Sequence, residues 1–268
     1  MSPLPPALDR AARFVYAAAA SVYLFTVGLL SQRHRKLIGQ IARHFGYDRM
    51  GATPSLATVP IAALTDPTHP VLLRAPDGAP GNVTLAELVA LALLVRTVRP
   101  QHVFEIGTFD GRTTLTLADN APEARVSTLD LPRTELDRTA FAVAPEERAL
   151  IDKDASGSRF LAFADARARI EQCYGDSATF DFSPYAGRCQ FVFIDGSHAY
   201  EYVRSDTERA FAMVGARGVI AWHDYGEWPG VTRALNEYVA TDRRFGGLRR
   251  IDGTTLAILS VGGALPGA

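Results

Sequence analysis

The sequence has few cysteines, no excess of one charge, no internal repeat and no low-complexity tract. Cys173 and Cys189 are the only cysteines in 268 residues. Their spacing matches no metal-binding pattern, so we expect buried thiols in a reducing compartment. Lysine and arginine total 28 against 29 acidic residues, and a chain without a basic excess lacks the electrostatic footprint of a nucleic-acid-binding protein. These absences leave a globular protein with one large domain, or one domain and an appendage.

A charge-free run near the N-terminus needs its own explanation. No charged residue occurs from Phe14 to Gln32, and the basic cluster 33–36 follows at once. A spanning helix needs about 20 mostly apolar residues, but four consecutive alanines make this run only weakly apolar. Two interpretations stay open for segment 1–49. It forms a helix that is buried or mediates a homo-oligomer, or residues 14–32 associate with a membrane and leave the rest in the cytoplasm. No small-residue cleavage site precedes the cluster, which argues against a cleaved signal.

Beyond a proline-rich connector at 50–82, expected to be irregular, strands and helices alternate. Thr84-Leu85-Ala86-Glu87 has the pattern of a capping box, and Pro100 ends the helix that it begins. We expect strands at 102–106, 125–129, 168–173, 190–194 and 218–222, with helices at 113–118, 200–214 and 230–240. Asp252-Gly253 joins a closing pair of strands, 248–251 and 255–261. Residues 83–268 therefore predict an α/β domain with a doubly wound, mostly parallel seven-stranded sheet and a terminal antiparallel hairpin.

Acids or histidines follow almost every expected strand, at Glu105, Asp130, Asp176, Asp195, His223 and Asp224. Ligands of open α/β sheets bind outside the carboxyl ends of the strands, so these side chains predict a binding site there. The first turn has glycines at Gly107 and Gly111. A dinucleotide fingerprint needs a glycine where this chain has Phe109, which disfavours a bound pyrophosphate.

The motifs Glu105–Thr114, Thr128–Pro132, Tyr174–Ser177, Phe193–Tyr200 and Trp222–Tyr225 together resemble the class I S-adenosylmethionine (SAM) methyltransferases. The closest subgroup contains small-molecule and sugar O-methyltransferases of the macrocin and cephalosporin-pathway type, with catechol-type relatives. The resemblance covers about two-thirds of the chain. It implies a Rossmann-like fold, SAM as cofactor and a hydroxylated small molecule as methyl acceptor.

The resemblance also implies roles for single residues. It assigns Glu105, Gly107, Thr108 and Gly111 to the turn that surrounds the amino-acid part of SAM with side chains and bare backbone. It also assigns Asp195 to the cofactor site. Asp130 would accept hydrogen bonds from both ribose hydroxyls, and Asp176 with Ser177 would contact the adenine. Turn formation remains an alternative for Asp176.

Two kinds of chemistry are open at the ends of the fourth and fifth expected strands. Carboxylates at Asp195 and Asp224 suit Mg²⁺, and catechol-type relatives place acids there, but His223 stands where those relatives have a second acid. His198 occupies the position of their general base, and His223 is the rival base.

The long excursion 131–167 is expected to cover the acceptor site. Two other functions are weighed against the methyltransferase: an NAD-linked oxidoreductase on a similar sheet, and a non-catalytic SAM-fold interaction protein.

Overall fold

The computed structural model describes residues 6–44, 52–79, 81–144, 147–148, 151–153 and 155–267. The chain divides into two compact units, Met1–Met50 and Gly51–Ala268. The first unit consists of helix α1 (Pro6–Leu24), the 3-10 helix η1 (Val27–Leu30) and helix α2 (Gln32–His44).

The charge-free run is not one helix, contrary to the simplest interpretation of its length. α1 ends at Leu24, and the Thr26 hydroxyl bonds back to the Val22 carbonyl at 2.7 Å, where it competes with the continuing helical ladder. Within the described part of the chain, no helix combines the length and the hydropathy that crossing a bilayer requires.

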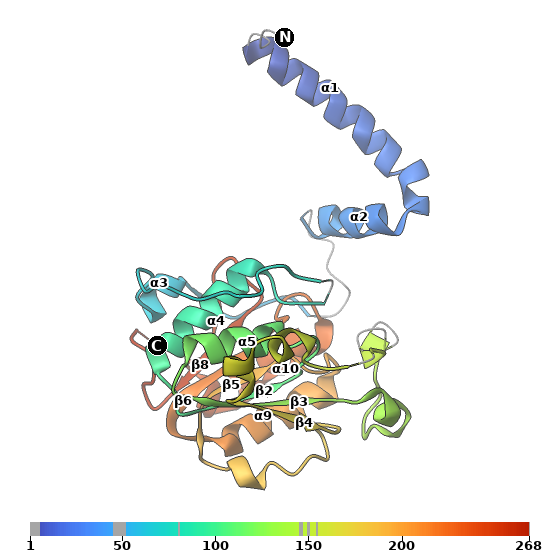
Figure 1. The fold of residues 1–268 in the computed structure, drawn as a ribbon. Helices are drawn as coiled ribbons and strands as arrows, with labels where there is room; N and C mark the ends of the chain where they lie inside the picture. The colour runs from blue at the N-terminus through green and yellow to red at the C-terminus, as the bar shows by residue number, and fades with distance from the viewer. Residues whose placement is uncertain are drawn as a thin grey trace. The chain divides into compact units, whose positions relative to one another are not determined.

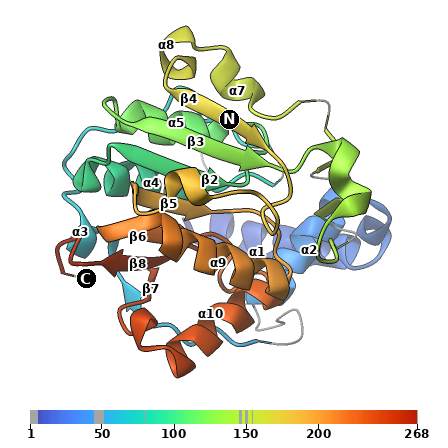
Figure 2. The same cartoon turned by 90° about the horizontal axis from the view of Figure 1, so that it is seen from below.

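The second unit is built on an eight-stranded sheet in the order β1-β7-β8-β6-β5-β2-β3-β4, which Figure 2 shows from β4 at one edge towards β7 at the other. The strands are β1 (Thr58–Val59), β2 (His102–Ile106), β3 (Arg125–Asp130), β4 (Ile170–Tyr174), β5 (Cys189–Ile194), β6 (Val214–Trp222), β7 (Arg249–Ile251) and β8 (Ala257–Val261). β8 pairs antiparallel with both β6 and β7, and the other pairs are parallel. The mixed, mostly parallel sheet and its closing hairpin are confirmed.

The sheet has one strand more than expected, because the proline-rich connector contributes β1. β1 is held by the backbone of β7 and of the turn after it. The Arg250 amide donates to the carbonyl of Ala57, which precedes β1, and the Asp252 amide donates to the Val59 carbonyl, both at 3.0 Å. Such a short strand leaves no periodic pattern in the sequence. The connector also contains the short helix α3 (Ile61–Leu64).

Helices cover both faces of the sheet (Figures 1 and 2). α4 (Leu85–Val98) and α5 (Arg112–Asn120) contribute to one hydrophobic cluster with Phe191 and Phe193 of β5. α9 (Tyr200–Met213) and α10 (Pro229–Thr241) contribute to the other. The excursion between β3 and β4 contains η2 (Arg133–Arg138), α7 (Ser158–Leu161) and α8 (Ala164–Arg167), and η3 (Ser183–Tyr185) and η4 (Arg243–Phe245) lie in later loops. The carboxyl ends of β2 to β6 thus lie together between two helical layers.

Candidate active site

The turn after β2 brings two backbone segments into direct contact. Gly107 has a φ of +103°, and a Cβ at this position would lie 2.0 Å from the Asp195 carbonyl oxygen. The amide of Asp195 donates to the Ile106 carbonyl at 2.8 Å, which fixes the end of β5 against β2. Gly111, with a φ of +82°, begins α5. Only glycine fits the first of these places, because both the conformation and the space exclude a side chain.

A cavity opens beside this turn at the carboxyl ends of β2 to β5. Of the residues assigned from the sequence, it is lined by Gly107, Asp130, Asp176, Ser177, Asp195 and His198. The excursion 131–167 also lines it, through Leu131, Val143, Glu147, Ile151 and Lys153. One wall of the cavity is therefore a segment whose position the sequence did not define.

Glu105 and Thr108 are buried next to lining residues and do not line the cavity themselves. The fully buried Glu105 carboxylate accepts hydrogen bonds from the Thr114 hydroxyl and, at 2.6 Å, from the Thr128 hydroxyl. Thr108 and Thr128 hydroxyl oxygens are 2.7 Å apart. Burial raises the pKa of Glu105 to about 8, so its proton is held more tightly than in water. The sequence assigned both residues to the cofactor pocket; the structure gives them contacts inside the fold.

Asp130 is held by two residues of the excursion. Its Oδ2 lies 2.8 Å from the Lys153 ammonium and accepts a hydrogen bond from the Ser156 hydroxyl. Asp176 accepts from the Ala140 amide at 2.6 Å and from the Ala178 amide at 3.0 Å. The second contact is the turn-forming role considered for Asp176, and its presence does not prevent the residue from lining the cavity.

His198 lies between two carboxylates. Its Nδ1 is 2.6 Å from Glu147 Oε1 and its Nε2 is 2.7 Å from Asp224 Oδ2. The ring stacks on Trp228, with centroids 4.1 Å apart. Burial opposes a charged ring, but the hydrogen bonds to Asp224 and Glu147 outweigh it and raise the pKa of His198 to about 9. With this pKa the ring carries a proton on each nitrogen at neutral pH. His198 therefore has to release one of these protons before it can accept a proton from another group.

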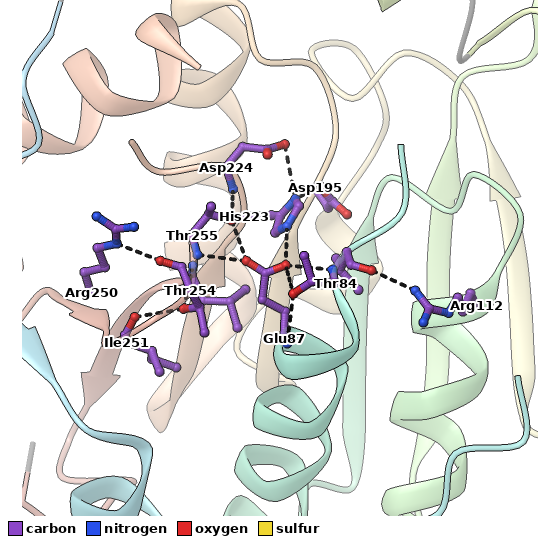
Figure 3. Close-up of polar contacts among 12 residues, drawn as sticks. Thr84, Glu87, Arg112, Asp195, His223, Asp224, Arg250, Ile251, Thr254 and Thr255 are labelled. Carbon is purple, nitrogen blue, oxygen red and sulfur yellow. Dashed lines mark hydrogen bonds and ion pairs between the residues drawn. The ribbon is translucent and has the colours of Figure 1, made fainter. Parts of the chain in front are cut away.

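His223 links the carboxylates that follow β5 and β6 (Figure 3). Its Nδ1 is 3.0 Å from Asp195 Oδ1 and 3.1 Å from Asp224 Oδ2. Its Nε2 is 3.2 Å from Glu87 Oε2. His223 does not line the cavity, and this placement argues against its role as the rival base.

Asp195, His198 and Asp224 bring one ligand atom each to within 4.8 Å of one another. The two carboxylates are those expected from the sequence to hold a metal ion, and His198 adds a nitrogen to the set. Burial raises the pKa of Asp195, whereas the neighbouring histidines hold the pKa of Asp224 well below its usual range. Asp195 and His198 line the cavity, whereas Asp224 does not, so the cluster is a candidate cation site next to the cavity.

Comparison with known proteins gives the fold a family. Residues 104–225 match a family model described as a methyltransferase domain. The matched segment is a methyltransferase domain, in agreement with the resemblance of its motifs to the class I SAM-dependent methyltransferases. This match decides against the NAD-linked oxidoreductase. No curated protein sequence matches the chain.

Several solved structures are similar to the methyltransferase chain over most of their length. An SAH-bound methyltransferase of Podospora anserina is 17% identical, with 69% of this chain and 81% of that chain covered and a TM-score of 0.46. The O-methyltransferase TomG from Streptomyces achromogenes, in complex with SAM, is 19% identical, with coverage of 68% and 82% and a TM-score of 0.46. An O-methyltransferase from Bacillus cereus in complex with SAH is also 19% identical, with coverage of 70% and 84% and a TM-score of 0.43. Likeness at this level does not assign a substrate.

Among the residues described above, the sequence analysis assigned no role at the site to Glu87, Glu147, Lys153 or Ser156. Glu87 was identified only as part of a capping box. The other three lie in the long excursion, where no periodic pattern indicates which side chains turn inward.

Proposed function

We propose that the methyltransferase domain transfers the methyl group of SAM to a hydroxyl of a small molecule. The observation that supports this proposal is the composition of one cavity. Asp130, Asp176 and Ser177 line it together with Asp195 and His198. The first three suit a nucleoside, and the last two provide polar groups for the reacting atoms.

In this proposal Asp130 accepts hydrogen bonds from the ribose hydroxyls, while Asp176 and Ser177 lie against the adenine. Gly107 provides backbone without a side chain next to the amino-acid part of the cofactor. Gly111 does not line the cavity; its open side faces Phe160 and Gly157. Glu105 and Thr108 act indirectly, by fixing the turn through their buried hydrogen bonds. Lys153 and Ser156 contact Oδ2 of Asp130, so a ribose hydroxyl that uses this oxygen has to replace one of them.

The reaction needs an in-line approach. The acceptor oxygen attacks the methyl carbon, the carbon–sulfur bond breaks to release S-adenosylhomocysteine (SAH), and the hydroxyl proton passes to a base. Holding the two reacting atoms in line supplies most of the acceleration in such a step. We assign the base to His198, which the flat stacking on Trp228 orients. It becomes competent when one ring nitrogen separates from its carboxylate, Asp224 or Glu147, because the loss of that hydrogen bond lowers the pKa of the ring and lets it release one proton to solvent.

The donor set of Asp195, His198 and Asp224 also fits a divalent cation. Mg²⁺ would use the two carboxylates and water, and a site that includes the imidazole suits Mn²⁺, Fe²⁺ or Zn²⁺ better. A bound cation would lower the cost of the developing alkoxide. Asp224 would then exchange its contact with His198 for the cation, and this exchange would free Nε2 of the ring.

Calorimetry with SAM and SAH, and with NAD⁺ as the control ligand, tests the cofactor assignment. Incubation with methyl-labelled SAM and a panel of phenols, catechols and sugars tests transfer to oxygen. Cofactor binding with no labelled product from the panel or from cell extract would favour the non-catalytic alternative. A product labelled on nitrogen or carbon would contradict O-methylation.

The base and the cation are separated by two further measurements. His198→Gln should lower turnover by roughly 100-fold or more with SAM affinity unchanged, if His198 is the base. Loss of activity in chelator, with recovery on adding a divalent cation and no such response in Asp224→Ala, would support the cation site. Full activity in chelator together with an unaffected His198→Gln enzyme would contradict both assignments.

A further inference from the structure

Glu87 on α4 is more heavily hydrogen-bonded than helix capping requires. Its Oε2 accepts from the Thr84 amide at 2.8 Å, as a capping box demands, and also from the Thr84 hydroxyl at 2.8 Å. Its Oε1 accepts from the Thr255 amide at 2.8 Å and from the Thr255 hydroxyl at 2.7 Å. Its Oε2 also lies 3.2 Å from His223 Nε2. Figure 3 shows the carboxylate at the centre of these contacts.

The burial of Glu87 sets it apart from an ordinary cap. The residue is 1% exposed, whereas helix capping alone does not require the carboxylate to be buried. Burying an ionised carboxylate is costly unless hydrogen-bond donors surround it. Here the donors come from three separate elements: the start of α4, the end of β6 and the start of β8.

Two routes connect Glu87 to the reacting centre. The first is the His223 ring. With Nε2 held at Glu87, the ring is fixed in the one orientation that places Nδ1 between Asp195 and Asp224, at 3.0 and 3.1 Å. A rotation of the ring would break the contact at both ends.

The second route passes through Thr255 to the backbone of Asp224. The Thr255 hydroxyl donates to Glu87 and accepts from the Asp224 amide at 3.3 Å. Asp224 has a φ of +64°, a left-handed conformation that is uncommon for a residue with a side chain. Glu87 therefore acts on both the side-chain partner and the main chain of the same carboxylate.

We propose that Glu87 is a positioning residue for methyl transfer, which sets the spacing and orientation of Asp195 and Asp224 through His223 and Thr255. This inference rests on the proposed function, in which Asp195 and His198 face the reacting atoms and Asp224 holds His198 or a cation. Glu87 itself does not line the cavity, so it reaches the chemistry only through its partners.

The chain offers a matched pair of variants. Glu87→Gln keeps the shape of the side chain but replaces one oxygen with an amide nitrogen. Each oxygen accepts only from donors. In the glutamine variant the amide nitrogen, itself a donor, therefore faces the donors of Thr255 in one orientation and those of Thr84 and His223 in the other, and either arrangement is unfavourable. Thr84→Ala removes the hydroxyl that accepts from the Glu87 amide at 3.3 Å and donates to Glu87 Oε2 at 2.8 Å. It leaves the Thr84 amide and the Glu87 contacts with His223 and Thr255 in place.

Steady-state kinetics and histidine NMR of the two full-length variants test the proposal. Glu87→Gln should lower kcat at least 10-fold with SAM affinity changed less than 2-fold, and should move the His223 Nε2 resonance. Thr84→Ala should lower the melting temperature while kcat and that resonance stay at wild-type values. Equal kcat in both variants, or an unmoved Nε2 resonance in Glu87→Gln, would overturn the proposal.

Two further measurements keep the outcome unambiguous. If Glu87→Gln does not fold, Thr255→Val tests the second route, because it removes the hydroxyl shared by Glu87 and Asp224; an unchanged kcat would overturn that route. If the wild type binds SAM but methylates no hydroxyl, the proposed function fails by itself. The NMR comparison still decides whether Glu87 holds His223.

Discussion

Replacing Glu105 with glutamine tests how a buried carboxyl next to the cavity responds to pH. The Glu105 carboxyl has a pKa of about 8 against an ordinary value of 4.5, because burial disfavours its charged form. The folded-state pKa is the higher one. The stabilisation is therefore complete below pH 4.5 and is lost as the pH rises towards 8, since the unfolded chain releases the proton first.

The size of the effect follows from these two values. Because the unfolded chain releases the Glu105 proton at a lower pH than the folded chain, the free energy of unfolding of the wild type falls by on the order of 3 kcal/mol between pH 5 and pH 8. A residue that does not ionise at this position causes no such loss. Glutamine has nearly the same shape and does not titrate. The Thr114 and Thr128 hydroxyls can turn to suit its amide. The difference in stability between the variant and the wild type should therefore grow in favour of Glu105→Gln as the pH increases.

Urea unfolding of both proteins at pH 5, 6, 7 and 8 measures this difference directly. The comparison cancels groups that titrate alike in the two chains. Parallel stability curves for wild type and Glu105→Gln would refute the reasoning. A second series with saturating SAH adds a test of contact: a cofactor ammonium close to Glu105 would lower its pKa and flatten the wild-type slope. An unchanged slope would keep Glu105 out of contact with the cofactor.

Other outcomes concern the cavity and the two units. Asp130→Ala should weaken SAM binding about 10-fold or more by calorimetry, because charge-assisted bonds to the ribose are lost; unchanged affinity would contradict the assignment. Removing residues 1–50 should leave SAM binding intact, since the cavity-lining residues begin at Gly81. Full-length protein that stays in solution without detergent would count against membrane association. Gly107→Ala should destabilise by more than about 2 kcal/mol, because its Cβ meets the Asp195 carbonyl at 2.0 Å. Gly187→Ala, at a φ of +66° with open space around it, should cost only about 1 kcal/mol.

The central strands could be predicted from local sequence because each is a short apolar run that ends at a polar residue or a glycine turn. The expected strand 102–106 is β2 as found, and the expected strand 190–194 is β5 without its first residue. β6 begins four residues before the expected 218, because Val214 pairs with Cys189 across an irregularity in the register. That pairing depends on a neighbouring strand and leaves no local pattern.

The candidate site was predictable only in part, because contacts between segments far apart in the chain leave no local sequence pattern. Parallel strands bring their carboxyl ends to one edge, so the meeting of Asp130, Asp176 and Asp195 followed from the order of the strands. Partners from loops did not follow. Glu87 has a local signature as a cap, but its contact with Thr255 joins positions 168 residues apart. Glu147 and Lys153 belong to a segment whose inward-facing side chains are chosen by tertiary packing.

The excursion between β3 and β4 ties two functions of the cavity to one segment of the chain. Lys153 and Ser156 contact Oδ2 of Asp130, and Glu147, six positions before Lys153, is bonded to the His198 ring and amide. Under the proposed function, the residue that binds the ribose and the residue that takes the acceptor proton thus have their neighbours in the same loop. Sequence changes in this loop would then alter cofactor affinity and turnover together, even where Asp130 and His198 themselves stay the same.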